Sequence, residues 1–330
     1  MAHSNSSLNC FANCQRKYQH AYILHTPTCK PPSPHLAFGT MGHEVLYKAG
    51  KMRDEINDNI IPDYESIVPS ELLYSELKEY FDISNWHNYF VPIIKQIAKY
   101  EQELIKEISV TGPLTIEREL KLQRTVEELR NNGINVTQPL VGVIDLLLLT
   151  PTHATILDYK FSTSRKNQDD FDMNSQLQIY ALLVNATYHI PFENITIGYI
   201  DIPKKESVMP IVLSNGTLSR AKSQNVTQDM FKLAVIATHG TDDPYYNCEP
   251  GGYYYDTYCN FAMNKPAYIT TRALDIDTYI GVISDILHEM ETIDKYEKYN
   301  LNYAAKYDSY SCNDCEYLTY CKPWLRPNKE

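Results

Sequence analysis

Two apolar runs joined by a four-residue turn constrain this chain more than any other feature. The sequence from residue 141 to 162 reads VGVIDLLLLTPTHATILDYKFS. Asp145 interrupts the first run, and Asp158 and Lys160 end the second. Apolar runs of this length are typical of core strands, and the short TPTH turn predicts an antiparallel hairpin. Because burying an unpaired charge is costly, these three charged residues need a partner or a function.

Strand geometry predicts that these charges meet. Side chains alternate between the two faces of a strand, so Asp158 and Lys160 share a face, and Asp145 is expected to share its face with Val141, Val143 and Leu147. Two carboxylates that converge at a sheet edge repel each other unless a cation lies between them. Carboxylate oxygens suit Mg²⁺ or Mn²⁺, and a neighbouring lysine can orient a water or stabilise charge on a phosphate. The alternative is a pair of partly exposed aspartates, one of them salt-bridged to Lys160.

The rest of the chain predicts helices around a central group of strands. Strands are expected at 115–123, 139–149, 154–161 and 195–201. Helices are expected at 70–108, 172–188 and 274–298, together with a loop leading into a helix at 35–50. This order predicts an α/β fold with a mixed central sheet flanked by helices.

Three further side chains are candidates for the same site. Gln176 and Tyr180 are four residues apart, so they lie on one helical face. That face either looks back on the metal site or places Tyr180 in the core and Gln176 in solvent. His43 follows the segment FGTMG near an expected helix start. It could supply a nitrogen ligand to the ion, or it could be structural.

The cysteines predict a second metal site. Cys312, Cys315 and Cys321 form a C-x2-C-x5-C cluster. Three thiolates need a fourth ligand to hold a tetrahedral zinc ion or a four-iron cluster. The N-terminal segment offers Cys10 or Cys14, and by chemistry alone zinc is favoured.

Composition narrows the class of protein. No apolar stretch approaches the roughly 20 residues of a membrane helix, and the polar first 30 residues do not resemble a signal peptide. We therefore expect an intracellular, cytoplasmic protein whose eight cysteines are not a disulfide framework. The formal charge of −11 excludes a surface that is basic all over but allows a local basic groove. The Asn-, Tyr- and Ile-rich composition is typical of AT-rich genomes, including viral ones.

The order of the candidate residues resembles that of the PD-(D/E)XK nuclease superfamily, in its RecB-type exonuclease branch. The matching residues are His43, Asp145, Asp158-x-Lys160 and Gln176-x-x-x-Tyr180, within the strings GVID, ILDYKFS and QLQIYALL. The resemblance implies that the histidine and both aspartates bind Mg²⁺ or Mn²⁺ and that the lysine assists the attacking water. It also implies that the glutamine and tyrosine support the site and the DNA. One departure is Asp158. The branch more often has glutamate at this position, and aspartate gives a shorter ligand arm.

The resemblance also changes the expected occupant of the cysteine site. A cysteine before the histidine motif and a final C-x2-C-x5-C are similar to those of AddB nuclease subunits and CRISPR-associated exonucleases that carry a 4Fe–4S cluster. The implied ligands are Cys14, Cys312, Cys315 and Cys321, with Cys14 preferred over Cys10 because the basic and aromatic QRKY follows it. Zinc is the less favoured occupant. Such a cluster would join the two ends of the chain as a structural staple.

Taken with the resemblance, the sequence predicts a restriction-endonuclease-like core in a single domain, residues 1–330. A helical insertion is expected at about 50–110, an irregular insertion at about 204–268 and a cysteine cluster at 312–321.

The expected activity is that of a metal-dependent deoxyribonuclease, an exonuclease acting on DNA with an accessible end in recombination or repair. The resemblance implies protein partners in a recombination or processing complex. We expect no association with a membrane. Arg165 and Lys166 are expected to hold the DNA backbone, unless they form a solvated loop. One alternative function is a catalytically inactive nuclease-fold DNA-binding module. Another is a zinc protein whose aspartates are incidental.

Overall fold

The computed structural model describes most of the 330-residue chain. The described residues are 2–30, 34–55, 62–67, 70, 86–110, 112–162, 175–203, 209–219, 221, 226, 228–240, 267–270, 276–297, 303, 312–313 and 315–325. Residues 163–174, which include the candidates Arg165 and Lys166, lie outside them.

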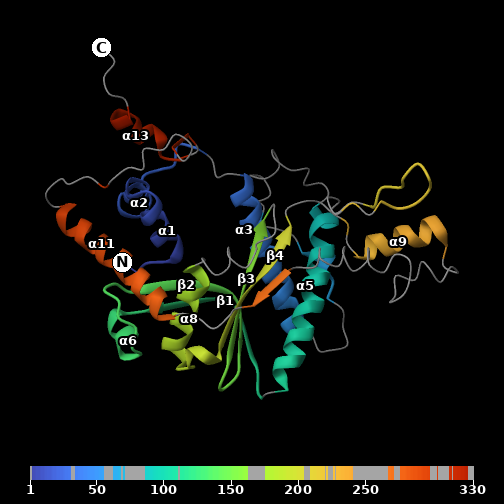
Figure 1. Cartoon of the computed structure of the whole chain (residues 1–330), viewed down its shortest axis with the longest axis horizontal. Coiled ribbons are helices and arrows are strands. Elements are labelled where there is room, and N and C mark those ends of the chain that lie inside the picture. The colour runs from blue at the N-terminus through green and yellow to red at the C-terminus, as the bar shows by residue number, and fades with distance from the viewer. Residues whose placement is uncertain are drawn as a thin grey trace, which may run out of the picture.

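A five-stranded mixed sheet forms the centre of the molecule (Figure 1). Its strands, in spatial as in chain order, are β1 (Thr115–Arg124), β2 (Leu140–Leu149), β3 (Ala154–Ser162), β4 (Ile195–Pro203) and β5 (Ala267–Thr270). β1, β2 and β3 are antiparallel neighbours, β3 and β4 are parallel, and β5 is antiparallel to β4. The hairpin expected between the two apolar runs is confirmed. Its turn is closed by Thr150, whose N–H donates to the His153 carbonyl at 2.9 Å.

Helices cover both faces of the sheet, as the mixed α/β prediction requires. One face carries α8 (Ser175–Tyr188), α1 (Asn5–Asn13) and α11 (Ile276–Glu297), which share one apolar core with the strands. The other face carries α3 (Pro34–Asp54) and α5 (Trp86–Ser109), which form a second core with β2, β3 and β4. The sheet therefore separates two cores. Where the pairing of β2 and β3 ends, side chains from the helices on either face can contact the strands.

The entry into α3 differs from the expected loop. The helix begins at Pro34, a residue tolerated in a first helical turn, so His43 lies in the middle of α3 and not near its start. Tertiary packing explains the longer helix, because two of its glycines, Gly42 and Gly50, lie directly on the sheet. A Cβ at Gly42 would overlap the Phe161 ring, and one at Gly50 would lie 2.5 Å from Arg118 Cζ.

Shorter elements complete the described chain. They are α2 (Gln15–Tyr18), the π-helix η1 (Gln19–Ile23), η2 (Tyr64–Ser66), α6 (Val126–Asn131), η4 (Phe192–Asn194), α9 (Gln228–His239) and α13 (Leu318–Leu325). The helix α9 falls in the segment expected to be irregular and has a small core of its own around Phe231. Of the helices described, none is long and apolar enough to cross a membrane.

Candidate active site

The hairpin opens at the two aspartates. β2 and β3 pair from Leu149 and Ala154 up to Leu146 and Leu157, and the next step of this register sets Asp145 opposite Asp158. There the ladder ends. The Tyr159 N–H, instead of continuing the ladder, donates to Asp145 Oδ2 at 2.8 Å. The expected convergence of the two carboxylates is thus produced by a fork between the strands.

The alternation of faces breaks at this fork, so the expectation that Asp145 shares a face with Leu147 was wrong. Ile144 and Leu147 both lie in the core beneath α8, while Leu146 lies in the core beneath α3. Opposite Asp145 on β1, Glu119 has a φ of 47°, in the left-handed region. A single residue in that conformation re-aims the strand and is frequent at functional sites.

His43 reaches Asp145 from the α3 side of the sheet. Its Nδ1 lies 3.2 Å from Asp145 Oδ1. Burial of the ring lowers the pKa of His43, but the Asp145 carboxylate outweighs this effect and leaves the pKa raised. The pair therefore favours an imidazolium that neutralises the aspartate.

Asp158 is held from the other side by β3 and α8. Lys160 Nζ lies 2.5 Å from Asp158 Oδ2 and donates to Gln176 Oε1 at 2.6 Å. Gln176 Nε2 donates to Asp158 Oδ1 at 3.0 Å and to the Tyr180 hydroxyl at 2.7 Å. Of the two alternatives for the Gln176–Tyr180 face, the structure has the one that looks onto the site. Burial raises the pKa of Asp158, which is 1% exposed, and the Asp145 charge raises it further.

A glycine that the sequence analysis did not single out sets the position of α8. A Cβ at Gly142 would lie 2.8 Å from Tyr180 Cε1 and 3.0 Å from Leu183 Cδ1. Only a residue without a side chain lets the Tyr180 ring lie this close to β2. The glycine that opens the GVID string was a signal for this close approach.

A buried ionic network behind the site was also not foreseen. Glu101 of α5 is 0% exposed and binds the guanidinium groups of Arg53 and Arg118. Arg118 Nε donates to Asp54 Oδ2 at 2.7 Å, and the Tyr159 hydroxyl donates to Glu101. Tyr159 therefore connects the two systems, since its N–H holds Asp145 and its hydroxyl holds the network.

The donors at the fork fit a hard divalent ion. In the part of the chain that the structure describes, no three His, Cys, Asp or Glu side chains form a ready-made metal site. The two carboxylates are instead held by His43 and Lys160. Yet Asp158 Oδ2 is buried and, apart from the Lys160 ion pair, has no hydrogen bond. Glu119, whose pKa is raised by burial and by Asp145, adds a third carboxylate close by. Oxygen donors with one imidazole suit Mg²⁺ or Mn²⁺.

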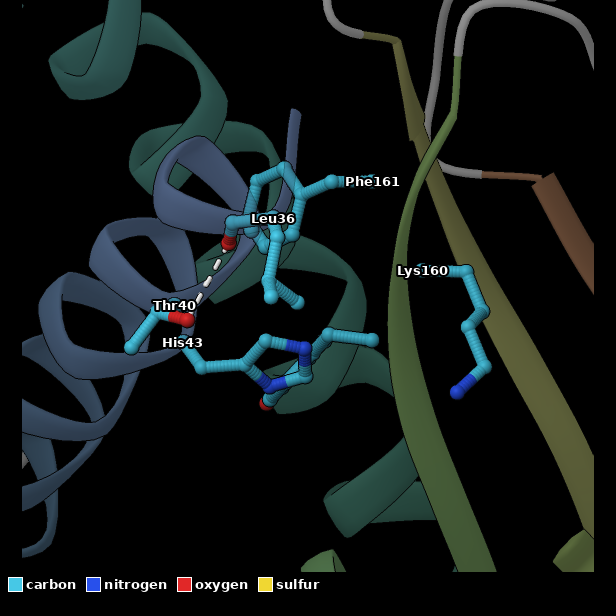
Figure 2. A pocket seen from close by; sticks show the side chains of 7 residues that line it. Leu36, Thr40, His43, Lys160 and Phe161 are labelled. Carbon is cyan, nitrogen blue, oxygen red and sulfur yellow. Dashed lines mark hydrogen bonds between the residues drawn. The ribbon is translucent and has the colours of Figure 1, made fainter. Parts of the chain in front are cut away.

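A pocket adjoins the fork on the α3 side (Figure 2). Its volume is about 580 Å³, and it is lined by Leu36, Gly39, Thr40, His43, Tyr159, Lys160 and Phe161. Figure 2 shows the Phe161 ring directed toward α3 and the Lys160 side chain directed to the opposite side of β3.

The cysteine-bearing ends of the chain lie together. Lys17 Nζ is 3.0 Å from Glu316 Oε1, and the Cys29 N–H donates to the Glu316 carbonyl at 2.8 Å. Burial raises the pKa of Cys321, and the other thiols contribute in the order Cys315, Cys14 and Cys312. The charges of Cys315, Cys14 and Cys312 thus act on Cys321, but among the described residues the thiols do not form a ready-made metal site.

Comparison with known proteins identifies the family. The profile of the PD-(D/E)XK nuclease superfamily matches residues 2–322. No curated protein matches the chain. A solved structure titled "Crystal structure of SSO0001" is 15% identical over 88% of this chain and 100% of its own, with a TM-score of 0.28, which is too low for a structural argument. Because the family profile spans nearly the whole sequence, the chain belongs to the PD-(D/E)XK nuclease superfamily.

Proposed function

We propose that this protein is a metal-dependent deoxyribonuclease that degrades DNA from an accessible end. The observation that carries the proposal is the fork at Asp145 and Asp158, with Lys160 and Gln176 bonded to the buried carboxylate. A structural ion pair would need neither the strand divergence nor the second aspartate. Membership of a nuclease superfamily supplies the reaction class.

Asp145, Asp158 and His43 would hold Mg²⁺ or Mn²⁺. When bound, the cation polarises the phosphate and lowers the pKa of a coordinated water. A cation would also relieve the repulsion between the carboxylates and favour the ionised form of Asp158, whose pKa burial raises. His43 would give up its ion pair with Asp145 and bind as the neutral imidazole.

Lys160 and α8 would order the water and the phosphate. Lys160 presents its ammonium beside Asp158 and within 5.4 Å of the centre of the Tyr199 ring. The ammonium can orient the attacking water or stabilise charge on the phosphate in the transition state. Gln176 ties the lysine, the aspartate and Tyr180 together, so it keeps this geometry before substrate arrives.

Substrate affinity would come from local basic groups in an acidic protein. Arg165 and Lys166 directly follow β3, and we assign them to the phosphate backbone of DNA. With a formal charge of −11, binding is expected to weaken steeply as salt rises. An end-processing role in recombination or repair, with protein partners, fits this chemistry.

The four cysteines would hold a 4Fe–4S cluster as a structural staple. Cys14 stands at the C-terminal end of α1 with an extended backbone, φ −159° and ψ 102°, and the other three thiols come from residues 312–321. Three features support the RecB-type exonuclease branch of the superfamily. They are the histidine helix, the D-x-K hairpin and this cysteine spacing. The colour of the purified protein tests the cluster, because a zinc protein is colourless.

A cleavage assay on end-labelled DNA tests the proposed activity. Linear single- and double-stranded DNA, labelled at either end, and circular single-stranded DNA are incubated with Mg²⁺ or Mn²⁺, with a chelator, and with the isosteric variant Asp158→Asn. We expect metal-dependent release of short products from linear DNA and loss of cleavage in the variant. Cleavage that survives the chelator or the variant contradicts the assignment, and equal cutting of circles shows an endonuclease.

A further inference from the structure

The pocket beside the fork has a lining that ion binding does not explain. Leu36 is 63% exposed, although it is a large apolar residue. The Phe161 ring packs edge-on against two other rings. Its centroid lies 5.8 Å from that of Phe38 and 5.6 Å from that of His43. Aromatic and aliphatic surfaces of this kind favour a flat, apolar-faced ligand.

The hydroxyl groups of the lining are already engaged. Thr40 Oγ1 donates to the Leu36 carbonyl at 3.1 Å (Figure 2), and the Tyr159 hydroxyl donates to Glu101. Neither hydroxyl offers its proton to a ligand. With both hydroxyls engaged, the aromatic and aliphatic faces of the lining are the main basis on which it can recognise a guest.

His43 belongs both to the fork and to the pocket. Its Nδ1 pairs with Asp145 at 3.2 Å, and its ring forms part of the pocket wall. A group in the pocket would thus lie beside a phosphate held between the two aspartates. In a nucleic acid, the flat group attached next to a phosphate is a nucleobase.

We propose that this pocket binds the unpaired base of the nucleotide adjoining the scissile phosphate, without sequence preference. The proposal rests on the proposed nuclease function and deepens it, since a base inside a duplex stack cannot present its face to Phe161. The substrate is then single-stranded DNA or a frayed end.

Gly39 provides a way to fill the pocket without disturbing the fold. It lines the pocket, and a Cβ built there meets nothing within 4 Å. The variant Gly39→Leu places a side chain in the pocket and raises helix propensity. Gly281 of α11 is a matched control, since its Cβ also meets nothing within 4 Å and it does not line the pocket.

The test has a cleavage arm and a binding arm. Oligonucleotides carry either a normal or an abasic residue next to the cleaved bond, and 2-aminopurine replaces the same base for fluorescence in chelator, where no cleavage occurs. The wild type and Gly281→Leu are expected to cut the normal substrate roughly 5- to 150-fold faster than the abasic one, the range for one stacked base. They should also quench the 2-aminopurine. Gly39→Leu should cut both substrates alike and should not quench.

The outcomes separate the pocket from the nuclease. Equal cutting of the two substrates by the wild type, without quenching, overturns the base pocket and leaves the nuclease standing. Quenching that persists in Gly39→Leu likewise overturns the pocket. A wild type that cuts nothing overturns the proposed function, and the quenching arm then decides the pocket by itself.

Discussion

The forked hairpin and the cysteine-bearing ends are built in opposite ways. At the fork, Asp158, Lys160 and Gln176 are bonded to one another within the sheet and α8, and the Tyr159 N–H holds Asp145. At the ends, the thiols come from segments about 300 residues apart, and burial raises the pKa of Cys315 and of Cys321. The fork is preorganised by the fold, whereas the proposed cluster would add a cross-link to the few polar contacts that join the ends. Chemistry and stability should therefore be separable by mutation.

The two ends also differ from each other. The N-terminal segment is part of the main structure, because Leu8 and Phe11 lie in the core and the His3 N–H donates to the Pro139 carbonyl at 2.8 Å. Among residues 312, 313 and 315–321, whose burial the structure describes, Tyr317 is the buried one. Loss of the staple should therefore release the C-terminal segment first and leave α1 in place.

The largest expected effect is on chemistry. Lys160→Met keeps the length of the side chain and removes its charge, so we expect cleavage per folded molecule to fall by about 10²- to 10³-fold. DNA binding should change little, because phosphate contacts elsewhere provide affinity. Thermal unfolding is measured alongside, because the variant leaves the buried Asp158 without its ion-pair partner. The control is Lys121→Met, which removes an exposed lysine of β1. A Lys160→Met protein that cuts at the wild-type rate would show that Lys160 only forms an ion pair and has no role in catalysis.

The next effect is on stability alone, from the network behind the fork. Glu101→Gln removes the counter-charge of Arg53 and leaves Arg118 with Asp54 alone, which should cost about 3–5 kcal/mol of unfolding free energy. Urea unfolding measures this cost, and the exposed Glu103→Gln is the matched control. Near-equal stability of the two variants would show that the network is not needed.

The same network sets an acid limit. Burial raises the pKa of Glu101, but Arg53 and Arg118 outweigh it and leave the pKa below its usual value of 4.5. A depressed pKa in the folded state adds stability that is complete above the unfolded value and is lost as pH falls through the folded value. The wild type should lose this stability in acid below about pH 4.5, and Glu101→Gln should show a shallower loss.

Features that depend on neighbouring residues could be predicted from the sequence, whereas features that depend on contacts between distant segments could not. The hairpin, its charges and the Gln176–Tyr180 face follow from local periodicity and spacing. The middle position of His43 in α3 and the break in alternation at Asp145 depend on tertiary packing, so no local pattern announces them. Glu101 was a missed signal, because it follows Ile97 by four residues on an otherwise apolar stripe.

Cys321→Ala should weaken the ends and leave the fork intact. We expect a colourless protein that is less stable by roughly 2–4 kcal/mol, as for loss of a long-loop cross-link. Limited proteolysis should cut first near the C-terminus, since α1 stays packed in the core. Activity per folded molecule should be unchanged. A variant as stable as the wild type would contradict the staple.

A smaller effect is expected from the edge of the fork. His43→Ala removes one nitrogen donor of three ligands, so the metal concentration for half-maximal activity should rise about tenfold, or ~1.4 kcal/mol. Mn²⁺ should rescue the variant better than Mg²⁺, because Mn²⁺ accepts nitrogen ligands more readily than Mg²⁺. The exposed His288→Ala of α11 is the control. An unchanged metal titration would make His43 structural.

The smallest effect tests which N-terminal thiol belongs to the staple. Cys10 lies in the last turn of α1, partly packed on the core, and burial raises its pKa to about 11, which favours the neutral thiol. Cys14 follows α1 in an extended conformation, and its charge acts on Cys321. Cys10→Ala should therefore keep the colour and lose less than about 1 kcal/mol, while Cys14→Ala should be colourless. Absorbance and thermal unfolding decide the matter, and a colourless Cys10→Ala beside a coloured Cys14→Ala would exchange their roles.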